Sequence, residues 1–357
     1  MTRKIFMILL AITLALSVGI IGCTEPAQQE EEEEEEPEVI ELTIATTTPV
    51  EAAPGAALTA WAEKVEEETE GRVHFTIYYA STLIEATEVL PAVLAGVADI
   101  ADYWPTAAPG EAPLQEMLYL PFLGFPSSQV ATTVVEEIFD SGVIPELNVE
   151  LQGAKMLYPC MASETTSYIH HTSKLIETVA DLDGMKIIAD GVMATYFDSL
   201  GAVSQFVPFE DTYTSLSTGM VEGHNGGFGW MFGSGVVELT PYHTDIGGIA
   251  MAGYAPVIMN PDSWNSLPAE IQVIFTDLAD FYYEQRIGAE LGAQAGGLDF
   301  TTNVLGHEYY DFPPEETALM IDAAEELHGT AIAEVEAKGL PGQALYDEIQ
   351  RLIGEYS

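Results

Sequence analysis

The pattern of apolar and polar positions after an apolar N-terminal run divides the chain into alternating strands and helices. Residues 42–46 predict a strand, and the helix after it has apolar residues at i, i+3, i+4 and i+7 from Leu58 and ends at Gly71. Residues 72–80 alternate strictly between apolar and polar side chains, as in a half-buried strand. Another short strand is expected within residues 98–104. Strands alternating with helices at this spacing predict an α/β domain with a mainly parallel sheet.

The same alternation restarts near Lys155 and continues to Gly253, which predicts a second α/β unit. Its expected strands cover residues 155–158, 166–171, 185–189 and 203–207, and its expected helices cover residues 192–200 and 210–219. The second of these helices should turn Tyr213 and Leu216 inward.

The last third of the chain has helical periodicity. Apolar residues at positions 271, 274, 275, 278 and 282 form one stripe, and no proline occurs between Pro268 and Pro313. A helix of about 30 residues is therefore allowed, roughly 45 Å long at about 1.5 Å per residue. Such a helix is long enough to brace two domains. Residues 315–338 predict another helix, with Gly339 as its stop signal.

The first 22 residues have the form of a lipoprotein signal. Arg3 and Lys4 precede a long apolar run that closes with the motif IIGC at Cys23. We expect residues 1–22 to be removed and Cys23 to carry lipid. The alternative is an uncleaved membrane anchor, because the run just reaches spanning length. In both cases the rest of the chain would lie outside the cytoplasm, tethered to a membrane.

Residues 23–39 are predicted to be an acidic, flexible linker. Seven consecutive glutamates between two prolines repel one another and bury no apolar surface, so they hold the folded body away from the membrane. The whole chain has a formal net charge of −47, with only ten lysines and arginines. Nucleic acid and anionic membrane surfaces are therefore poor partners.

Few residues suggest covalent chemistry. Cys160 is the only cysteine after Cys23, so an intrachain disulfide and a thiolate-rich zinc site are excluded, and a small buried side chain is the favoured interpretation. His170 and His171 are adjacent on an expected strand and would point to opposite faces, which favours a structural role over a metal site. No HExxH or GxSxG motif occurs, and no enzymatic activity is expected.

Seven segments follow one another along nearly the whole body. They are TEGRVHFTIYYASTL, AGVADIADYW, LQEMLYLPFLGFP, ETVADLDGMKI, SLGAVSQFVPFEDTYTSLSTGMVEG, SWNSLPAEIQVIF and GHEYYDFPPEE. In their order and spacing, behind a lipoprotein signal, they resemble the substrate-binding proteins of tripartite ATP-independent periplasmic (TRAP) transporters, of the DctP type (solute-binding protein family 7).

The resemblance implies a two-lobed α/β fold of the periplasmic-binding-protein type, class II, with one long helix bracing both lobes. Lobe I would comprise residues 40–160 with parts of 255–357 packed on it, lobe II would comprise residues 161–254, and residues 260–357 would form the C-terminal helical region. The implied function is an extracytoplasmic receptor that delivers a small organic solute to the membrane subunits of a TRAP permease. No cofactor is implied, although some relatives bind their ligand through a bridging divalent cation, which Asp190 or Asp211 could hold here.

The chain departs from the family at the position that usually selects the ligand. Members read Lys-Ile-Arg-Val-Pro where residues 186–190 here read Lys-Ile-Ile-Ala-Asp, so Ile188 replaces an arginine that pairs bidentately with the ligand's carboxylate. Six of the remaining basic residues, Arg286 among them, are expected on exposed faces or element ends, which leaves Lys155 and Lys186 as replacements. We therefore expect a neutral, zwitterionic or aromatic ligand, or a carboxylate held by hydroxyls and backbone donors.

Candidate site residues come mainly from the carboxyl ends of the expected strands, where open α/β sheets bind ligands. From lobe I they are Thr46, Thr48, Tyr79, Tyr103 and Trp104. From lobe II they are Tyr168, Ile188, Asp190, Asn225 and Trp230, and the family pattern of the next helix adds Asp211 and Tyr213. The glycine-rich segment 223–235 lacks the spacing of a phosphate-binding loop and should bend to present His224, Asn225, Phe228 or Trp230 to the cleft.

Two other functions remain open at this point. A sensor or adhesive lipoprotein could keep this fold without transport, and the absence of neighbouring genes for two TRAP membrane proteins would favour it. An extracellular hydrolase or lyase could pair two acids among Asp190, Asp211 and Glu222, but acids are so abundant here that such pairs are expected by chance.

Overall fold

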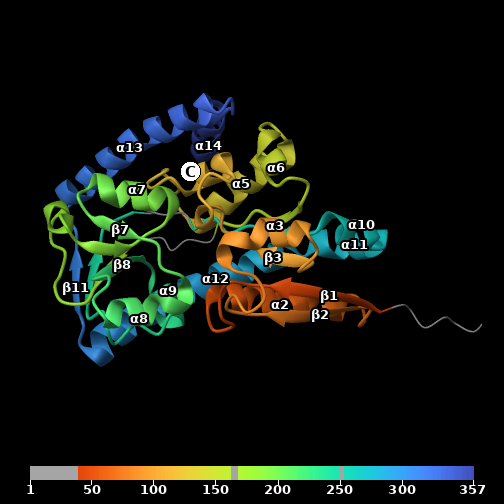
Figure 1. Ribbon diagram of the computed structural model, residues 1–357, viewed down its shortest axis with the longest axis horizontal. Coiled ribbons are helices and arrows are strands. Elements are labelled where there is room, and N and C mark those ends of the chain that lie inside the picture. The colour runs from red at the N-terminus through yellow and green to blue at the C-terminus, as the bar shows by residue number, and fades with distance from the viewer. Residues whose placement is uncertain (1–38, 162–167, 249–252) are drawn as a thin grey trace, which may run out of the picture. The chain divides into compact units, whose positions relative to one another are not determined.

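The computed structural model describes residues 39–161, 168–248 and 253–357 (Figure 1). The expected signal and nearly all of the expected linker, including Cys23, lie outside the described residues. Within the described residues, no helix combines the length and the apolar character needed to cross a membrane.

The first sheet has five strands in the order β2-β1-β3-β10-β4. These strands are β1 Ile40–Ala45, β2 Val73–Tyr78, β3 Ile100–Asp102, β4 Lys155–Tyr158 and β10 Val257–Met259. β1 pairs in parallel with β2 and β3, whereas β10 runs antiparallel to both β3 and β4. The alternation expected for β2 is confirmed, because Val73, Phe75 and Ile77 are more buried than the residues between them.

The second sheet has six strands in the order β11-β9-β5-β8-β6-β7. They are β5 Tyr168–His171, β6 Lys186–Ile188, β7 Val203–Gln205, β8 Gly223–Gly226, β9 Tyr242–Asp245 and β11 Glu308–Asp311. β5 is antiparallel to both of its neighbours, and the other pairs are parallel. β10 alone opposes the other strands of the first sheet, and β5 alone opposes those of the second, so the expectation of a mainly parallel sheet is confirmed for both sheets. In each, antiparallel pairing brings together strands that are distant in sequence.

Helices cover the sheets and join them. Between the strands lie α2 Ala53–Glu68, α3 Val89–Leu94, α4 Pro113–Glu116, α5 Ser128–Ser141, α6 Glu146–Glu150, α7 Gly191–Ser199, α8 Thr212–Ser217 and α9 Phe228–Gly233. Short 3-10 turns are η1 Ala86–Glu88, η2 Pro105–Ala107, η3 Met117–Tyr119, η4 Val179–Leu182 and η5 Phe209–Asp211. Helix α8 buries Leu216 as expected, but Tyr213 is 49% exposed, so its inward orientation is a wrong prediction.

The C-terminal region is helical, as expected. Its elements are α10 Pro261–Ser266, α11 Ala269–Asp277, α12 Ala279–Asp299, the π-helical turn η6 Phe300–Leu305, α13 Pro314–Ala337 and α14 Gly342–Tyr356. The single long helix expected after Pro268 is interrupted at Leu278, where the backbone leaves the helical region between α11 and α12. In Figure 1 the blue helix α13 runs along α7 and ends beside α14.

Helix α12 packs against one helix beside the first sheet and one helix beside the second sheet. It lies against α2, which covers the first sheet, and against α9, which follows β8 of the second sheet. The contact with α9 is close, because a Cβ atom at Gly297 would lie 2.4 Å from Cβ of Phe228. The absence of a side chain at Gly297 is thus what allows the two helices to approach.

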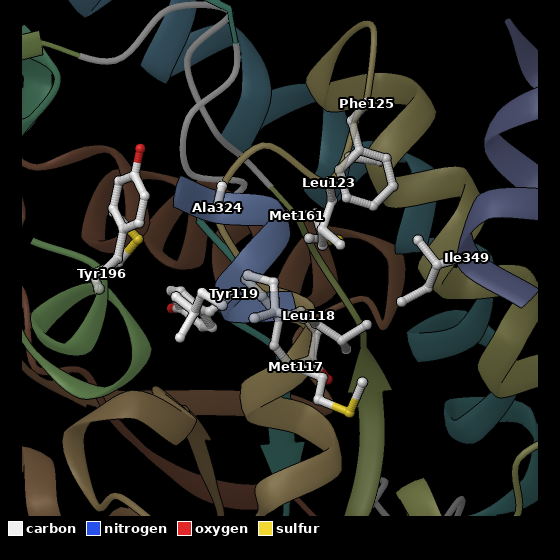
Figure 2. Packing of buried hydrophobic residues seen from close by; sticks show 14 of the residues in the cluster. Met117, Leu118, Tyr119, Leu123, Phe125, Met161, Tyr196, Ala324 and Ile349 are labelled. Atoms are coloured by element: carbon white, nitrogen blue, oxygen red, sulfur yellow. The ribbon is translucent and has the colours of Figure 1, made fainter. Parts of the chain in front are cut away.

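The apolar core consists of several clusters. Trp61 of α2 packs edge-on against Phe275 of α11 with ring centroids 5.2 Å apart, beneath the first sheet. The largest cluster joins η3, α5, α7, α13 and α14. Figure 2 shows part of it, including Leu118 and Tyr119 of η3, Ala324 of α13 and Ile349 of α14. Tyr119 also reaches the cavity described next.

Candidate ligand-binding cavity

A cavity of about 420 Å³ lies between residues of the two sheets. From the first sheet and its loops it is lined by Thr47, Thr48, Ser81, Trp104, Thr106 and Tyr119. From the second sheet and its helices it is lined by Ile188, Asp190, Met193, Phe206, Phe209, Asn225 and Trp230. Helix α12 contributes Arg286 and Glu290. The cavity therefore draws side chains from the carboxyl ends of β1, β6 and β8, where ligand sites of open α/β sheets are found.

The wall from the first sheet is organised by Asp102, the last residue of β3. Its carboxylate accepts hydrogen bonds from Oγ1 of Thr46 at 3.0 Å, from the backbone N–H of Thr47 at 3.1 Å and from Nε1 of Trp104 at 3.3 Å. Burial raises the pKa of Asp102, while these donors and the charge of Arg286 act in the opposite direction. Asp102 thus fixes the chain after β1 and the indole of Trp104 at the cavity.

The wall from the second sheet begins where β6 ends. Ile188 is buried and lines the cavity, and Asp190 lines it two residues later, just before α7. The next residue, Gly191, has a φ of +48°, and a Cβ atom there would lie 2.9 Å from Cβ of Thr106. The turn after β6 therefore touches the opposite wall, and glycine permits both the backbone conformation and the contact.

Asp190 has no basic partner among the described residues within ion-pair distance. Burial raises its pKa to about 6, against weaker opposing effects of a backbone N–H and the Thr106 hydroxyl. Tyr119 lies close by, and its pKa is raised by burial and by the charge of Asp190. The carboxyl group therefore retains an unsatisfied preference for a cation or a strong hydrogen-bond donor.

Arg286 is the basic residue of the cavity. Its side chain is only 2% exposed, and one of its terminal nitrogens pairs with Glu290 one turn later on α12. Burial alone would lower the pKa of the guanidinium, but Glu290, Cys160 and Tyr282 together outweigh burial and hold the pKa above its usual range. The Nε of Arg286 is buried and has no hydrogen-bond partner among the described residues. The expectation that Arg286 lies on an exposed face is wrong.

A cluster of histidines lies behind the second wall. Nδ1 of His170 lies 2.7 Å from Nδ1 of His243, whose Nε2 lies 2.9 Å from Nδ1 of His307. The ring of His224 lies between those of His170 and Trp230, tilted against both, with ring centroids 4.7 Å and 4.3 Å away. Burial lowers the pKa of His224 and of His243 to about 3, and that of His170 well below its usual range. The cluster is therefore neutral at physiological pH.

The described residues contain no group of three or more His, Cys, Asp or Glu side chains arranged to hold a metal ion. The two adjacent histidines do point apart, since His171 accepts a hydrogen bond from the backbone N–H of Ser173 at 3.0 Å instead of joining the cluster. Cys160 is a buried free thiol, and burial raises its pKa.

The structure brings six of the twelve predicted binding residues to the cavity: Thr48, Trp104, Ile188, Asp190, Asn225 and Trp230. The other six do not line it: Thr46, Tyr79, Tyr103, Tyr168, Asp211 and Tyr213. Thr46 is held behind the wall by Asp102, the hydroxyl of Tyr79 bonds to Thr59 at 2.7 Å, and the hydroxyl of Tyr103 bonds to Glu111 at 3.2 Å. Strand-end position alone therefore does not decide which way a side chain points.

Within the glycine-rich segment, Asn225 and Trp230 reach the cavity, while His224 and Phe228 are buried behind it. The segment forms β8 and α9 instead of a bent loop. Lys155 and Lys186, the expected replacements for the missing arginine, are exposed and do not line the cavity, and Lys155 lies over the ring of Trp264 at 5.1 Å.

Sequence reasoning missed the structural role of Asp102 and the cavity positions of Thr106, Tyr119 and Arg286. For Arg286 a signal was present. It follows Tyr282 by four residues on the apolar stripe of the C-terminal helix, and a charged residue on a buried stripe points inward. No comparable signal marks Tyr119, which ends the 3-10 turn η3 directly after the four-residue helix α4.

Comparison with known proteins places the chain among binding proteins. The sequence model of the family "Bacterial extracellular solute-binding protein, family 7" matches residues 44–334. A curated solute-binding protein from Chromohalobacter salexigens is 24% identical over 199 residues, which are 53% of this chain and 56% of that protein. The chain thus spans a little over half the length of that relative.

Two solved structures extend the likeness to nearly the whole chain. A TRAP periplasmic solute-binding protein from Desulfovibrio salexigens is 27% identical with a TM-score of 0.73, covering 89% of this chain and 97% of the other. A TRAP solute-binding protein from a marine metagenome, described as specific for aromatic acid ligands, is 26% identical with a TM-score of 0.79, covering 90% and 99%. These matches confirm the predicted two-lobed α/β fold.

Proposed function

Because the chain belongs to the bacterial extracellular solute-binding proteins of family 7, we propose that it is a TRAP-type receptor that binds a small organic solute outside the cytoplasm. The family and its solved relatives are solute-binding proteins and not enzymes. Bound solute would be handed to the membrane subunits of a TRAP permease. Binding of the solute would stabilise the arrangement in which the two walls are closed around it. The solute itself would undergo no covalent change.

The observation that supports this proposal most is the composition of the cavity. Its volume of about 420 Å³ suits a small organic molecule. Its lining combines apolar and aromatic surface with a few polar groups, among them Asp190, Asn225 and Arg286. A few fixed polar groups in an otherwise apolar cavity orient a ligand and select it.

The aromatic lining favours a solute with a flat or apolar body. Trp104 projects from the first wall, and Phe209 and Trp230 of the second wall lie edge to face with ring centroids 5.8 Å apart. The marine metagenome relative is described as specific for aromatic acids. An aromatic or similarly flat solute would fit between these rings and bury its faces against them.

Membrane attachment is proposed through Cys23. The basic and apolar N-terminal pattern supports lipidation at this residue, and the glutamate run after it supports a spacer between the lipid and the folded body. In cells, mass spectrometry of the mature protein should find lipid on the N-terminal cysteine, and Cys23→Ser should release the protein from membranes. A Cys23→Ser protein that stays in the membrane fraction with its signal intact would instead support the uncleaved anchor.

The receptor function is tested by isothermal calorimetry of the folded body against aromatic acids, dicarboxylates, amino acids and neutral aromatics. We expect at least one solute to bind, and Trp230→Ala to weaken that binding at least tenfold because it removes a wall of the cavity. Trp264→Ala is the matched control, since Trp264 lies beside Lys155 outside the cavity. If no solute binds, or if both variants lose affinity equally, the receptor proposal fails.

A further inference from the structure

Among the described residues, the cavity is lined by several acidic groups and a single basic one. These charged lining residues are Glu85, Asp190, Glu210, Arg286 and Glu290. Glu85 and Glu210 are exposed, whereas the pair of Arg286 and Glu290 is largely buried on α12. Since that pair cancels its own charge, Asp190 is the group within the cavity whose charge no lining residue compensates.

Arg286 nevertheless keeps donor capacity toward a solute. A guanidinium has five N–H donors, and the hydrogen bonds found for Arg286 among the described residues go to Glu290 alone. Its buried Nε has no partner, and an unsatisfied buried donor of a charged group is costly. A carboxylate in the cavity would satisfy that donor and is the geometric complement of a guanidinium edge.

The carboxylate of Asp190 would be stabilised by a cationic group of the solute. Within the part of the chain that the structure describes, no lysine, histidine or second arginine lines the cavity beside it. The rings of Trp104 and Trp230 line the same cavity, and the faces of such rings attract cations. An ammonium or amidinium group near Asp190 would gain both the ion pair and the ring faces.

The two charged ends, Asp190 and Arg286, line the same cavity of about 420 Å³, which has the size of a small organic solute. Tyr119 lines the same cavity as these two groups. The two groups come from different elements, the turn after β6 and helix α12. A molecule between them would therefore contact both the second wall and the bracing helix.

We propose that the solute is a zwitterion whose carboxylate binds Arg286 and whose cationic group binds Asp190, with an apolar body between the tryptophans. The inference rests on the proposed receptor function and names the chemical class of its solute. A plain acid would satisfy Arg286 but add a second negative charge near Asp190. A plain amine would satisfy Asp190 but leave Nε of Arg286 without an acceptor.

The test uses trios of probes that share one skeleton. They are 4-(aminomethyl)benzoate, 4-methylbenzoate and 4-methylbenzylamine; phenylalanine, 3-phenylpropanoate and 2-phenylethylamine; and 5-aminopentanoate, pentanoate and pentylamine. Calorimetry at pH 7.5 should show, in at least one trio, that the zwitterion binds at least tenfold more tightly than the acid and the amine. An acid or an amine that binds as tightly as its zwitterion in every trio would overturn the proposal.

Variants then assign each end. Asp190→Asn should remove the preference for the zwitterion over the acid. The double variant Arg286→Gln, Glu290→Gln should remove the preference for the zwitterion over the amine without leaving a lone buried charge. Asp262→Asn and Arg351→Gln, both at exposed positions, are the controls and should change neither preference. Preferences that survive both cavity variants would contradict the assignment.

The outcomes separate this inference from the function on which it rests. If no trio member binds but another solute of the wider panel does, the zwitterion is wrong and the receptor stands. If no solute of either set binds, the receptor proposal fails with it. Thermal unfolding of every variant checks that a lost preference does not come from a lost fold.

Discussion

The walls from the first and the second sheet each hold an aspartate, but the two carboxylates differ in the partners that surround them. Asp102 accepts hydrogen bonds from Thr46, Thr47 and Trp104. Across the cavity, Asp190 has no basic partner, and the nitrogens of His224 behind it have no hydrogen-bond partner among the described residues. The difference indicates that the first wall is a preorganised support. In the second wall, the solute would supply the ionic partner that Asp190 lacks.

The largest effect is expected from breaking the support of the first wall. Asp102→Asn replaces a carboxylate that accepts three bonds with an amide that has one acceptor oxygen, so the free energy of unfolding should fall by about 3 kcal/mol. Urea denaturation measures the change, and Asp262→Asn at the surface should stay within about 0.5 kcal/mol of wild type. A fall no larger than that of the control would mean that Asp102 does not organise this wall.

The histidines behind the second wall predict a loss of stability in acid. His224 has a pKa of about 3 when folded and an ordinary value when unfolded, so the unfolded chain takes up a proton that the folded protein does not. Stability from this residue is complete above about pH 6.5 and falls by about 1.4 kcal/mol per pH unit as the pH drops toward the folded pKa. When the pH is lowered from 7 to 4.5, the free energy of unfolding of wild type should therefore fall by about 2.5 kcal/mol more than that of His224→Leu.

Comparing wild type with the His224→Leu variant at each pH removes the effect of other titrating groups. Among these, Glu150, with a pKa raised to about 7 by burial, acts in the opposite direction. If the free energy of unfolding changed with pH in the same way in both proteins, His224 would not be buried in its neutral form.

The joint between the bracing helix and the second wall is tested at Gly297. Alanine there would place its Cβ 2.4 Å from Phe228, so we expect a loss of about 2 kcal/mol in unfolding free energy from overpacking. Gly292→Ala on the same helix meets nothing within 4 Å and should instead gain up to about 1 kcal/mol from helix propensity. Equal effects at the two positions would show that α12 and α9 are not in close contact.

The smallest effect concerns the contact between the walls. Gly191→Ala must push against Thr106, so solute affinity should fall by about tenfold, or about 1.4 kcal/mol, as the turn after β6 is displaced. Gly184→Ala is the matched control, because it also has a positive φ, +74°, but meets nothing within 4 Å. Calorimetry with the best-bound probe measures both. Equal affinities in the two variants would mean that this contact does not support the bound state.

Much of the fold could be predicted from the sequence because periodicity is a local signal. The strand at residues 155–158 and the helix from about residue 315 to Ala337 agree closely with the expectation. The antiparallel pairing of β10 could not be foreseen, because Val257–Met259 is only a short apolar stretch and its neighbours are set by contacts distant in sequence. Strand direction is decided by the whole chain, not by the residues of the strand.

Position along a strand predicts some of the cavity residues but does not fix the direction of every side chain. Ile188 and Asp190 follow from the end of β6, whereas Tyr103, at the end of β3, turns into the core beside Trp104, which faces the cavity. The sequence-based expectation places Arg286 on an exposed face or an element end, although its position on the apolar stripe argues for burial. The missing arginine at position 188 is thus balanced by one from another part of the chain.

The central claim is that Arg286 binds the acidic end of the solute in place of the arginine absent at position 188. A crystal structure of the body with the best-bound zwitterion tests it most directly. We predict the solute carboxylate within hydrogen-bonding distance of Nε of Arg286 and the cationic group beside Asp190. A solute bound with its carboxylate away from Arg286, on backbone or hydroxyl donors alone, would contradict the claim.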